Sequence, residues 1–180
     1  MEEHTRRAFL GAGVTLAAGI AGCASDGNGG TPTDTPTPTE TPGTVPGDQY
    51  PTVERWLTTT AVGGADDSYG GTVVDARGRD TVTVDVGSEG NGGHFAFGPS
   101  AVLVSAGTTV EWVWTGEGGA HNVEALPEEQ LQESDYEFTS GEPVTAAGTE
   151  FTRTLEEPGI ALYHCEPHLS LGMKGAIAVE

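Results

Sequence analysis

The stretch Asp80-Thr81-Val82-Thr83-Val84-Asp85-Val86 alternates polar and apolar side chains, as a half-buried β-strand does. Further short segments rich in β-branched and aromatic residues follow it, each bounded by glycine or proline. These segments are 102–104, 109–114, 150–155, 160–165 and 176–179. Short strands at this spacing are typical of a β-sandwich. We therefore expect an all-β sandwich over residues 49–180.

Two smaller features of this domain can also be predicted. Residues 127–135 contain helix-favouring Glu, Gln and Leu with a proline near their start, and they predict one short helix. Trp112 and Trp114 would share one face of their strand. We expect both in the sandwich core and assign them no chemistry.

Length and charge limit the function. The 180 residues suffice for one ordinary domain with tails. Asp and Glu number 27 against 7 Lys and Arg, a net charge of −20, which argues against nucleic acid or anionic lipid as a direct partner. High salt would screen the self-repulsion of such a surface, so a halophilic source fits, and acidity that only confers solubility fits equally well.

The N-terminus has the order of an export signal. Arg6 and Arg7 precede an apolar stretch from Gly11 to Ala21, which predicts a twin-arginine signal peptide over residues 1–22. The stretch ends in Ile20-Ala21-Gly22-Cys23, which resembles a lipobox, so we expect lipid on Cys23. The alternative is an ordinary buried or free cysteine beside a signal peptide.

The next segment is too polar to fold. From Asp26 to Asp48 the chain consists almost entirely of Gly, Thr, Pro, Asp and Glu, which predicts a disordered Thr/Pro-rich linker over residues 23–48. At about 3.1 Å per residue, this stalk could hold a domain up to about 70 Å from its anchor. Signal, lipid site and stalk together predict a module tethered to the outer face of the cell membrane.

Three candidate metal ligands lie close together near the C-terminus. If Cys23 carries lipid, Cys165 has no partner for a disulfide, and an unpaired thiol outside the cell requires a reason. His168 and Met173 follow it within nine residues, and His121 follows a glycine-rich connection after a predicted strand. Singly, they could be a buried thiol, a loop histidine or a core methionine. Together, two imidazoles, a thiolate and a weak thioether favour a blue (type 1) copper site, whereas zinc prefers four strong ligands.

The stretch Tyr163-His164-Cys165-Glu166-Pro167-His168-Leu169-Ser170-Leu171-Gly172-Met173-Lys174-Gly175 resembles the copper loop of plastocyanins, Cys-x-x-His-x-x-x-x-Met. Segments 97–99, 107–112 and 118–123 are similar to halocyanins, the lipid-anchored plastocyanin-like proteins of halophilic archaea. The likeness covers most of residues 50–180. It implies a cupredoxin Greek-key β-sandwich with one type 1 copper ion. It also implies that the backbone N–H of Asn122 donates to the Cys165 sulfur, and that Pro167 removes another potential donor.

The sequence departs from plastocyanins at one position. Plastocyanins usually have tyrosine just before the copper cysteine, where this chain has His164. Strand alternation points His164 away from the face that carries Cys165, so we expect an exposed, titratable histidine and no ligand. His94 lacks the context of a family ligand, and we expect it at the surface.

These observations predict a one-electron carrier that cycles between Cu(II) and Cu(I). The expected partners are membrane-associated redox proteins, and the expected state is a monomer. An enzyme such as a multicopper oxidase would need histidines for a second copper centre, and only four histidines remain once the signal is removed. A copper storage or delivery protein at the cell surface remains the alternative.

Overall fold

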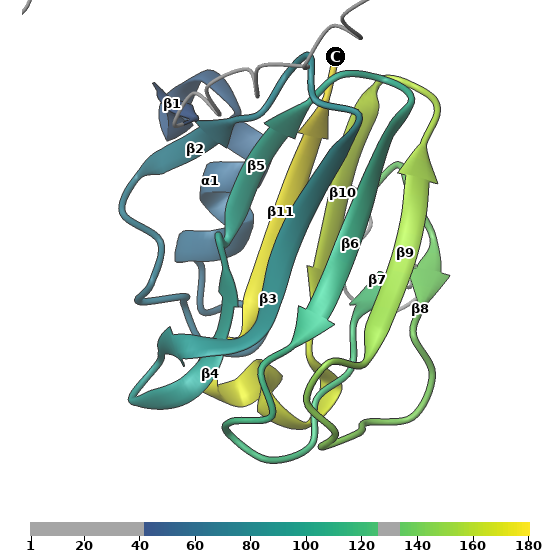
Figure 1. Ribbon diagram of the computed structural model, residues 1–180. Helices are drawn as coiled ribbons and strands as arrows, with labels where there is room; N and C mark the ends of the chain where they lie inside the picture. Colours follow the sequence, from purple (N-terminus) through teal and green to yellow (C-terminus); the bar gives the residue numbers. More distant parts are fainter. Residues whose placement is uncertain (1–41, 126–133) are drawn as a thin grey trace, which may run out of the picture. The chain divides into compact units, whose positions relative to one another are not determined.

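Two β-sheets pack face to face in a computed structural model of the chain, which describes residues 42–125 and 134–180 (Figure 1). Residues from both sheets, among them Val84, Trp112, Tyr163 and Ile177, form one hydrophobic core between them. This arrangement confirms the predicted all-β Greek-key sandwich. The core is rich in aromatic side chains, with Trp112 and Tyr163 packed edge to face at a centroid distance of 5.4 Å.

The larger sheet has seven strands in the order β1-β2-β5-β11-β10-β7-β8. Their bounds are β1 (Gly43–Pro46), β2 (Thr72–Asp75), β5 (Ala101–Val104), β7 (Glu124–Ala125), β8 (Phe138–Thr139), β10 (Gly159–His164) and β11 (Lys174–Val179). The smaller sheet has the order β4-β3-β6-β9, and its strands are β3 (Thr81–Gly90), β4 (Gly93–Gly98), β6 (Thr108–Trp114) and β9 (Glu150–Leu155). All six strands predicted from the sequence are present, as β3, β5, β6, β9, β10 and β11.

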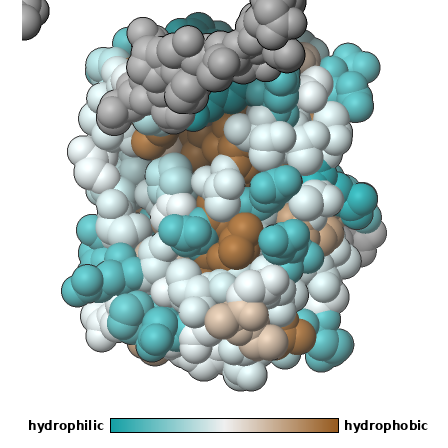
Figure 2. Space-filling view, in the orientation of Figure 1, coloured by the Kyte–Doolittle hydropathy of each residue, from teal (hydrophilic) through white to brown (hydrophobic). Residues whose placement is uncertain are grey.

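Strand β6 illustrates why the alternating pattern folds as it does. Val110, Trp112 and Trp114 are buried, while Thr109 and Glu111 lie on the opposite, partly exposed side. The prediction that both tryptophans belong to the core is therefore confirmed. The outward side of this sheet is largely hydrophilic or neutral, with small apolar areas only (Figure 2).

A helix that the sequence analysis missed covers the outer face of the larger sheet. Helix α1 (Pro51–Thr58) begins with proline and buries Val53, Trp56 and Leu57, spaced three and four residues apart. These side chains form a second hydrophobic core with residues of β2, β5, β10 and β11. Two short 3-10 helices, η1 (Gly47–Gln49) and η2 (Glu166–Leu171), complete the described structure.

The folded domain begins earlier than the predicted boundary at Gln49. Strand β1 pairs antiparallel with β2, from Gly43 opposite Asp75 to Pro46 opposite Thr72. This pairing satisfies the backbone hydrogen bonds of the polar segment 43–46, so these residues, which were predicted as linker, belong to the folded sheet. Residues 1–41, which include Cys23 and the predicted signal, lie outside the described residues.

The helix predicted at 127–135 also lies largely outside the described residues, and its last two residues, Ser134 and Asp135, are not helical. Within the described ranges, no helix is long and apolar enough to cross a membrane.

Candidate metal centre

The four predicted ligands come together at one end of the sandwich. His121 lies in the connection after β6, Cys165 directly follows β10, His168 lies in η2, and Met173 directly precedes β11. The Nδ1 atoms of both histidines and the Sγ atom of Cys165 all lie within 4.8 Å of one another. Met173 is fully buried in the same core as Cys165, and its backbone carbonyl accepts a hydrogen bond of 3.1 Å from the Cys165 N–H.

The separations of the three donor atoms fit a trigonal metal site. Cys165 Sγ lies 3.6 Å from His121 Nδ1 and 3.4 Å from His168 Nδ1, and the two Nδ1 atoms are 3.1 Å apart. Metal–nitrogen bonds of about 2.0–2.1 Å and a metal–sulfur bond of about 2.3 Å in one plane would place the nitrogens about 3.5 Å apart and each about 3.8 Å from the sulfur. The observed triangle is slightly smaller and has the same shape, so the donor set fits one ion.

His121 is fixed in the tautomer that a metal requires. Its Nε2 lies 2.8 Å from the carbonyl oxygen of Glu117, so Nε2 carries the proton and Nδ1 keeps its lone pair for a metal. The Trp114 indole donates to the His121 carbonyl at 2.9 Å, and His121 and Val144 exchange two backbone hydrogen bonds of 2.9 Å. Burial lowers the pKa of His121, which favours the neutral, metal-binding form.

A glycine leaves the space that the His121 ring occupies. Gly118 has φ +77°, and a Cβ atom there would lie 2.8 Å from His121 Nε2 and 2.3 Å from the His94 carbonyl oxygen. Only glycine combines this left-handed backbone with the space that the imidazole needs. The glycine-rich connection therefore serves to seat the histidine.

Cys165 is buried, and burial raises the pKa of its thiol to about 11. The backbone N–H groups of Asn122 and His168 donate to the sulfur and oppose this rise. The Asn122 side-chain oxygen also accepts a hydrogen bond of 2.8 Å from the Glu166 N–H, so Asn122 joins the loop of His121 to that of Cys165. Pro167 lies at the start of η2 and offers no N–H.

His168 is the one partly exposed member of the metal-binding cluster. Its ring packs on Phe95 at a centroid distance of 4.7 Å. Two large hydrophobic side chains are exposed in the described structure, Leu171 at 46% and Val144 at 39%. Leu171 lies in η2 with His168, and Val144 pairs with His121, so both are close to the ligands. Leu169, by contrast, is partly buried against the second core.

The expectation that His164 is exposed is wrong. Its side chain points away from Cys165 as predicted, but α1 covers that face, and His164 is only 9% exposed, with Trp56 at a ring distance of 6.5 Å. Burial, and secondarily the charge of Lys174, lowers the pKa of His164 to about 4. His94 is exposed on β4, as expected.

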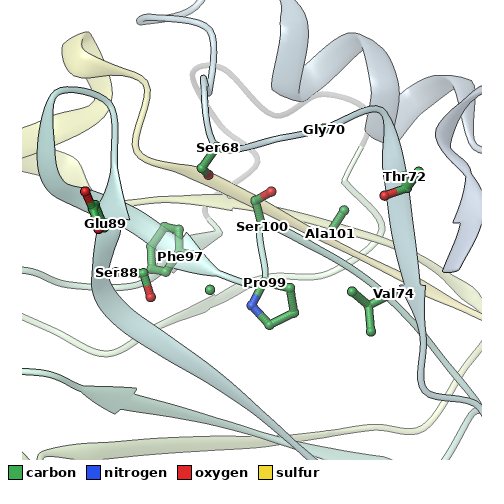
Figure 3. Close-up of a pocket in the computed structure, with 11 residues that line it drawn as sticks. Ser68, Gly70, Thr72, Val74, Ser88, Glu89, Phe97, Pro99, Ser100 and Ala101 are labelled. Carbon is green, nitrogen blue, oxygen red and sulfur yellow. The ribbon is translucent and has the colours of Figure 1, made fainter. Parts of the chain in front are cut away.

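A hollow in the surface is lined by none of these ligands. It is lined by residues of β2, β3, β4 and the start of β5, among them Thr72, Ser88 and Ala101 (Figure 3). Hydroxyl groups and the carboxylate of Glu89 are its polar features, and no histidine, cysteine or methionine lines it. It therefore lacks the nitrogen and sulfur ligands that a type 1 copper ion takes.

Comparison with known proteins agrees with this site. The family described as copper binding proteins, plastocyanin/azurin family, matches residues 82–180. Halocyanin of Natronomonas pharaonis is 43% identical over the full length of both chains, and plastocyanin of Scenedesmus fuscus is 36% identical over 55% of this chain and 99% of its own. Among solved structures, pseudoazurin of Methylobacterium extorquens AM1 has a TM-score of 0.41 at 25% identity, over 56% of this chain and 75% of that one.

The family and halocyanin matches come from the sequence, and the donor set comes from the structure. Both identify copper as the cofactor, in an arrangement of the type 1 kind. This chain belongs to the plastocyanin/azurin family of blue copper binding proteins.

Proposed function

We propose that the chain carries single electrons, with one copper ion held by His121, Cys165, His168 and Met173. The observation that carries this proposal is the triangle of two imidazole nitrogens and one sulfur at 3.1 to 3.6 Å. When bound, copper supplies the one-electron couple between Cu(II) and Cu(I).

The surrounding residues keep the ligands in place. Glu117, Trp114 and Val144 hold His121 through hydrogen bonds, and Asn122 links its loop to the loop of Cys165. Such fixed ligands limit structural change between oxidation states, which favours fast electron transfer.

Electrons enter and leave through the exposed edge of His168. This side chain is the partly exposed ligand, and Leu171 beside it gives an apolar surface in a strongly acidic protein. A small apolar area suits brief docking with a redox partner.

Copper storage or delivery is the competing function. A carrier of that kind must release its ion, whereas His121, Cys165 and Met173 are each at most 1% exposed here. An oxidase would need a second metal centre, and the described ranges contain one cluster of three metal-ligating His, Cys, Asp or Glu side chains. Burial of the ligands therefore favours electron transfer over release.

The N-terminal segment completes the proposal. A twin-arginine signal over residues 1–22, lipid on Cys23 and a Thr/Pro-rich stalk would tether a monomeric domain to the outer face of the cell membrane. Membrane-associated redox proteins would then be its partners, and the net charge of −20 suits a salty exterior. Fractionation of cells that express Cys23→Ser should find the protein released with its copper spectrum intact. Continued membrane association would indicate an uncleaved signal.

Voltammetry of the copper-loaded protein tests electron transfer itself. A reversible one-electron wave, together with no oxidase activity, is expected. A colourless metal that exchanges readily with chelators, with no reversible wave, would instead establish storage.

A further inference from the structure

A segment outside the family match lies directly against the copper loop. Residues Val62–Asp67 connect α1 to β2, whereas the family match begins at residue 82. We call Val62–Asp67 together with Asn91 the brace.

The brace contacts the copper loop backbone to backbone. The Gly64 N–H donates to the Leu169 carbonyl at 2.9 Å. A Cβ atom on Gly64 would lie 2.8 Å from the Gly172 nitrogen and 2.9 Å from the Leu171 carbonyl carbon. On the other side, a Cβ on Gly172 would lie 2.1 Å from the Ala65 carbonyl oxygen. No side chain separates the two segments at these points, so a displacement of one is transmitted to the other.

Asn91 is the centre of the brace. It lies in the tight turn between β3 and β4 with a left-handed φ of +57°. Its Nδ2 carries two hydrogens and lies within hydrogen-bonding distance of three acceptors, the carbonyls of Phe95 at 2.8 Å and Gly172 at 3.1 Å and the Oδ1 of Asp66 at 3.1 Å. Its Oδ1 accepts from the Asp67 N–H at 2.9 Å. One side chain therefore ties the connection after α1 to the residue that precedes Met173.

The peptide group between Gly172 and Met173 is held from both sides. Asn91 binds its carbonyl, and its N–H, on Met173, donates to the His168 carbonyl at 3.2 Å. His121 has different supports, since Trp114, Glu117 and Val144 hold it. A change in the brace should therefore act on Met173 before it acts on His121.

We infer that Asn91 is a positioning residue for Met173, and that the brace sets how firmly the thioether is presented to copper. This inference rests on the proposed function, because it concerns the potential of that same site. The weak axial ligand tunes the potential of a blue copper centre. A looser thioether donates less to the oxidised ion, so loosening the brace raises the reduction potential.

Two variants disturb the brace in different ways. Asn91→Gly keeps the left-handed turn and removes the side-chain bonds. It should raise the potential, alter the relative intensities of the visible bands, and speed amide exchange at Met173 in the metal-free protein about tenfold, the factor expected for one lost hydrogen bond. Gly64→Ala, whose φ is not left-handed, presses on the backbone of the copper loop and should also shift the potential.

Val104→Ala is the matched control, because Val104 is buried at the end of β5 next to Glu180, away from the copper loop (Figure 1). It should lower stability and leave the potential and spectrum unchanged. If the parent protein is blue but Asn91→Gly and Gly64→Ala both keep its reduction potential, the inference is overturned. A shift in Val104→Ala as large as in the brace variants would overturn it too, because the potential would then follow stability alone. A colourless parent would refute the proposed function instead.

Discussion

Replacing Gly175 with alanine should destabilise the domain strongly, because the space beside its Cα is filled by an immobile ring. Gly175 lies in β11 opposite Tyr163 of β10. A Cβ atom there would lie 2.3 Å from Cε2 and Cζ of Tyr163 and 2.6 Å from its Oη. Tyr163 is fully buried between Phe97 and Trp112, at centroid distances of 4.9 and 5.4 Å, so its ring cannot move aside.

The size of the effect follows from this packing. Added groups in a well-packed core usually cost about 1–3 kcal/mol. The added Cβ atom of Gly175→Ala would meet three atoms of a ring that is enclosed on its other sides, which places the cost at the upper end of this range. We therefore expect the free energy of unfolding to fall by about 3 kcal/mol. For a domain of this size, that loss corresponds to a fall in Tm of about 10 °C.

Urea unfolding of the metal-free protein, followed by tryptophan fluorescence, measures this loss. The midpoint should fall while the slope of the free energy of unfolding against urea stays constant. Gly70→Ala is the control, since nothing lies within 4 Å of the position that its Cβ atom would take, and its φ is not left-handed. It should change stability by less than about 0.5 kcal/mol. A loss below about 1 kcal/mol for Gly175→Ala would refute the reasoning.

Four further substitutions test the metal centre and its surface. Cys165→Ser should abolish the visible absorption at about 600 nm while circular dichroism still reports the β-sandwich, because the colour needs the thiolate and the core does not. Retained colour would contradict the copper assignment. Pro167→Ala should raise the potential, provided that its new N–H points at the sulfur and withdraws electron density from it, and voltammetry showing a fall would count against this. Leu171→Glu should slow electron self-exchange about tenfold without altering the spectrum, because a carboxylate must be desolvated on docking. An unchanged exchange rate in Leu171→Glu would exclude the route through His168. Leu169→Glu should instead lower the stability of the domain, since Leu169 packs against the second core.

The parts of the structure that the sequence predicted are those with local signals. Alternating side chains located β3 and β6, and the spacing of Cys165, His168 and Met173 located most of the metal centre. These signals are strong because strand period and loop length are set by neighbouring residues.

The features that were missed depend on contacts between distant segments. Helix α1 has only eight residues and three buried apolar positions, too short a pattern to stand out. Without it, strand alternation placed His164 in solvent, when in fact Trp56 covers it. The acceptors for His121 and Asn91 are the backbone carbonyls of Glu117 and Gly172, and a carbonyl has no sequence signature.

Gly175 gives a different lesson. A glycine close to a ligand loop is easily taken as a source of flexible backbone, but the φ of Gly175 is not left-handed and its role is to leave room for Tyr163. Whether a glycine provides freedom or space is decided by what packs over it, which becomes visible only in three dimensions.

An absorption spectrum combined with metal analysis of the purified protein tests the copper assignment most directly. One copper ion per chain should accompany an intense band at about 600 nm, which disappears on reduction and returns on oxidation. A colourless protein at full copper occupancy, or one in which zinc takes the site and copper does not, would contradict a centre built from His121, Cys165, His168 and Met173.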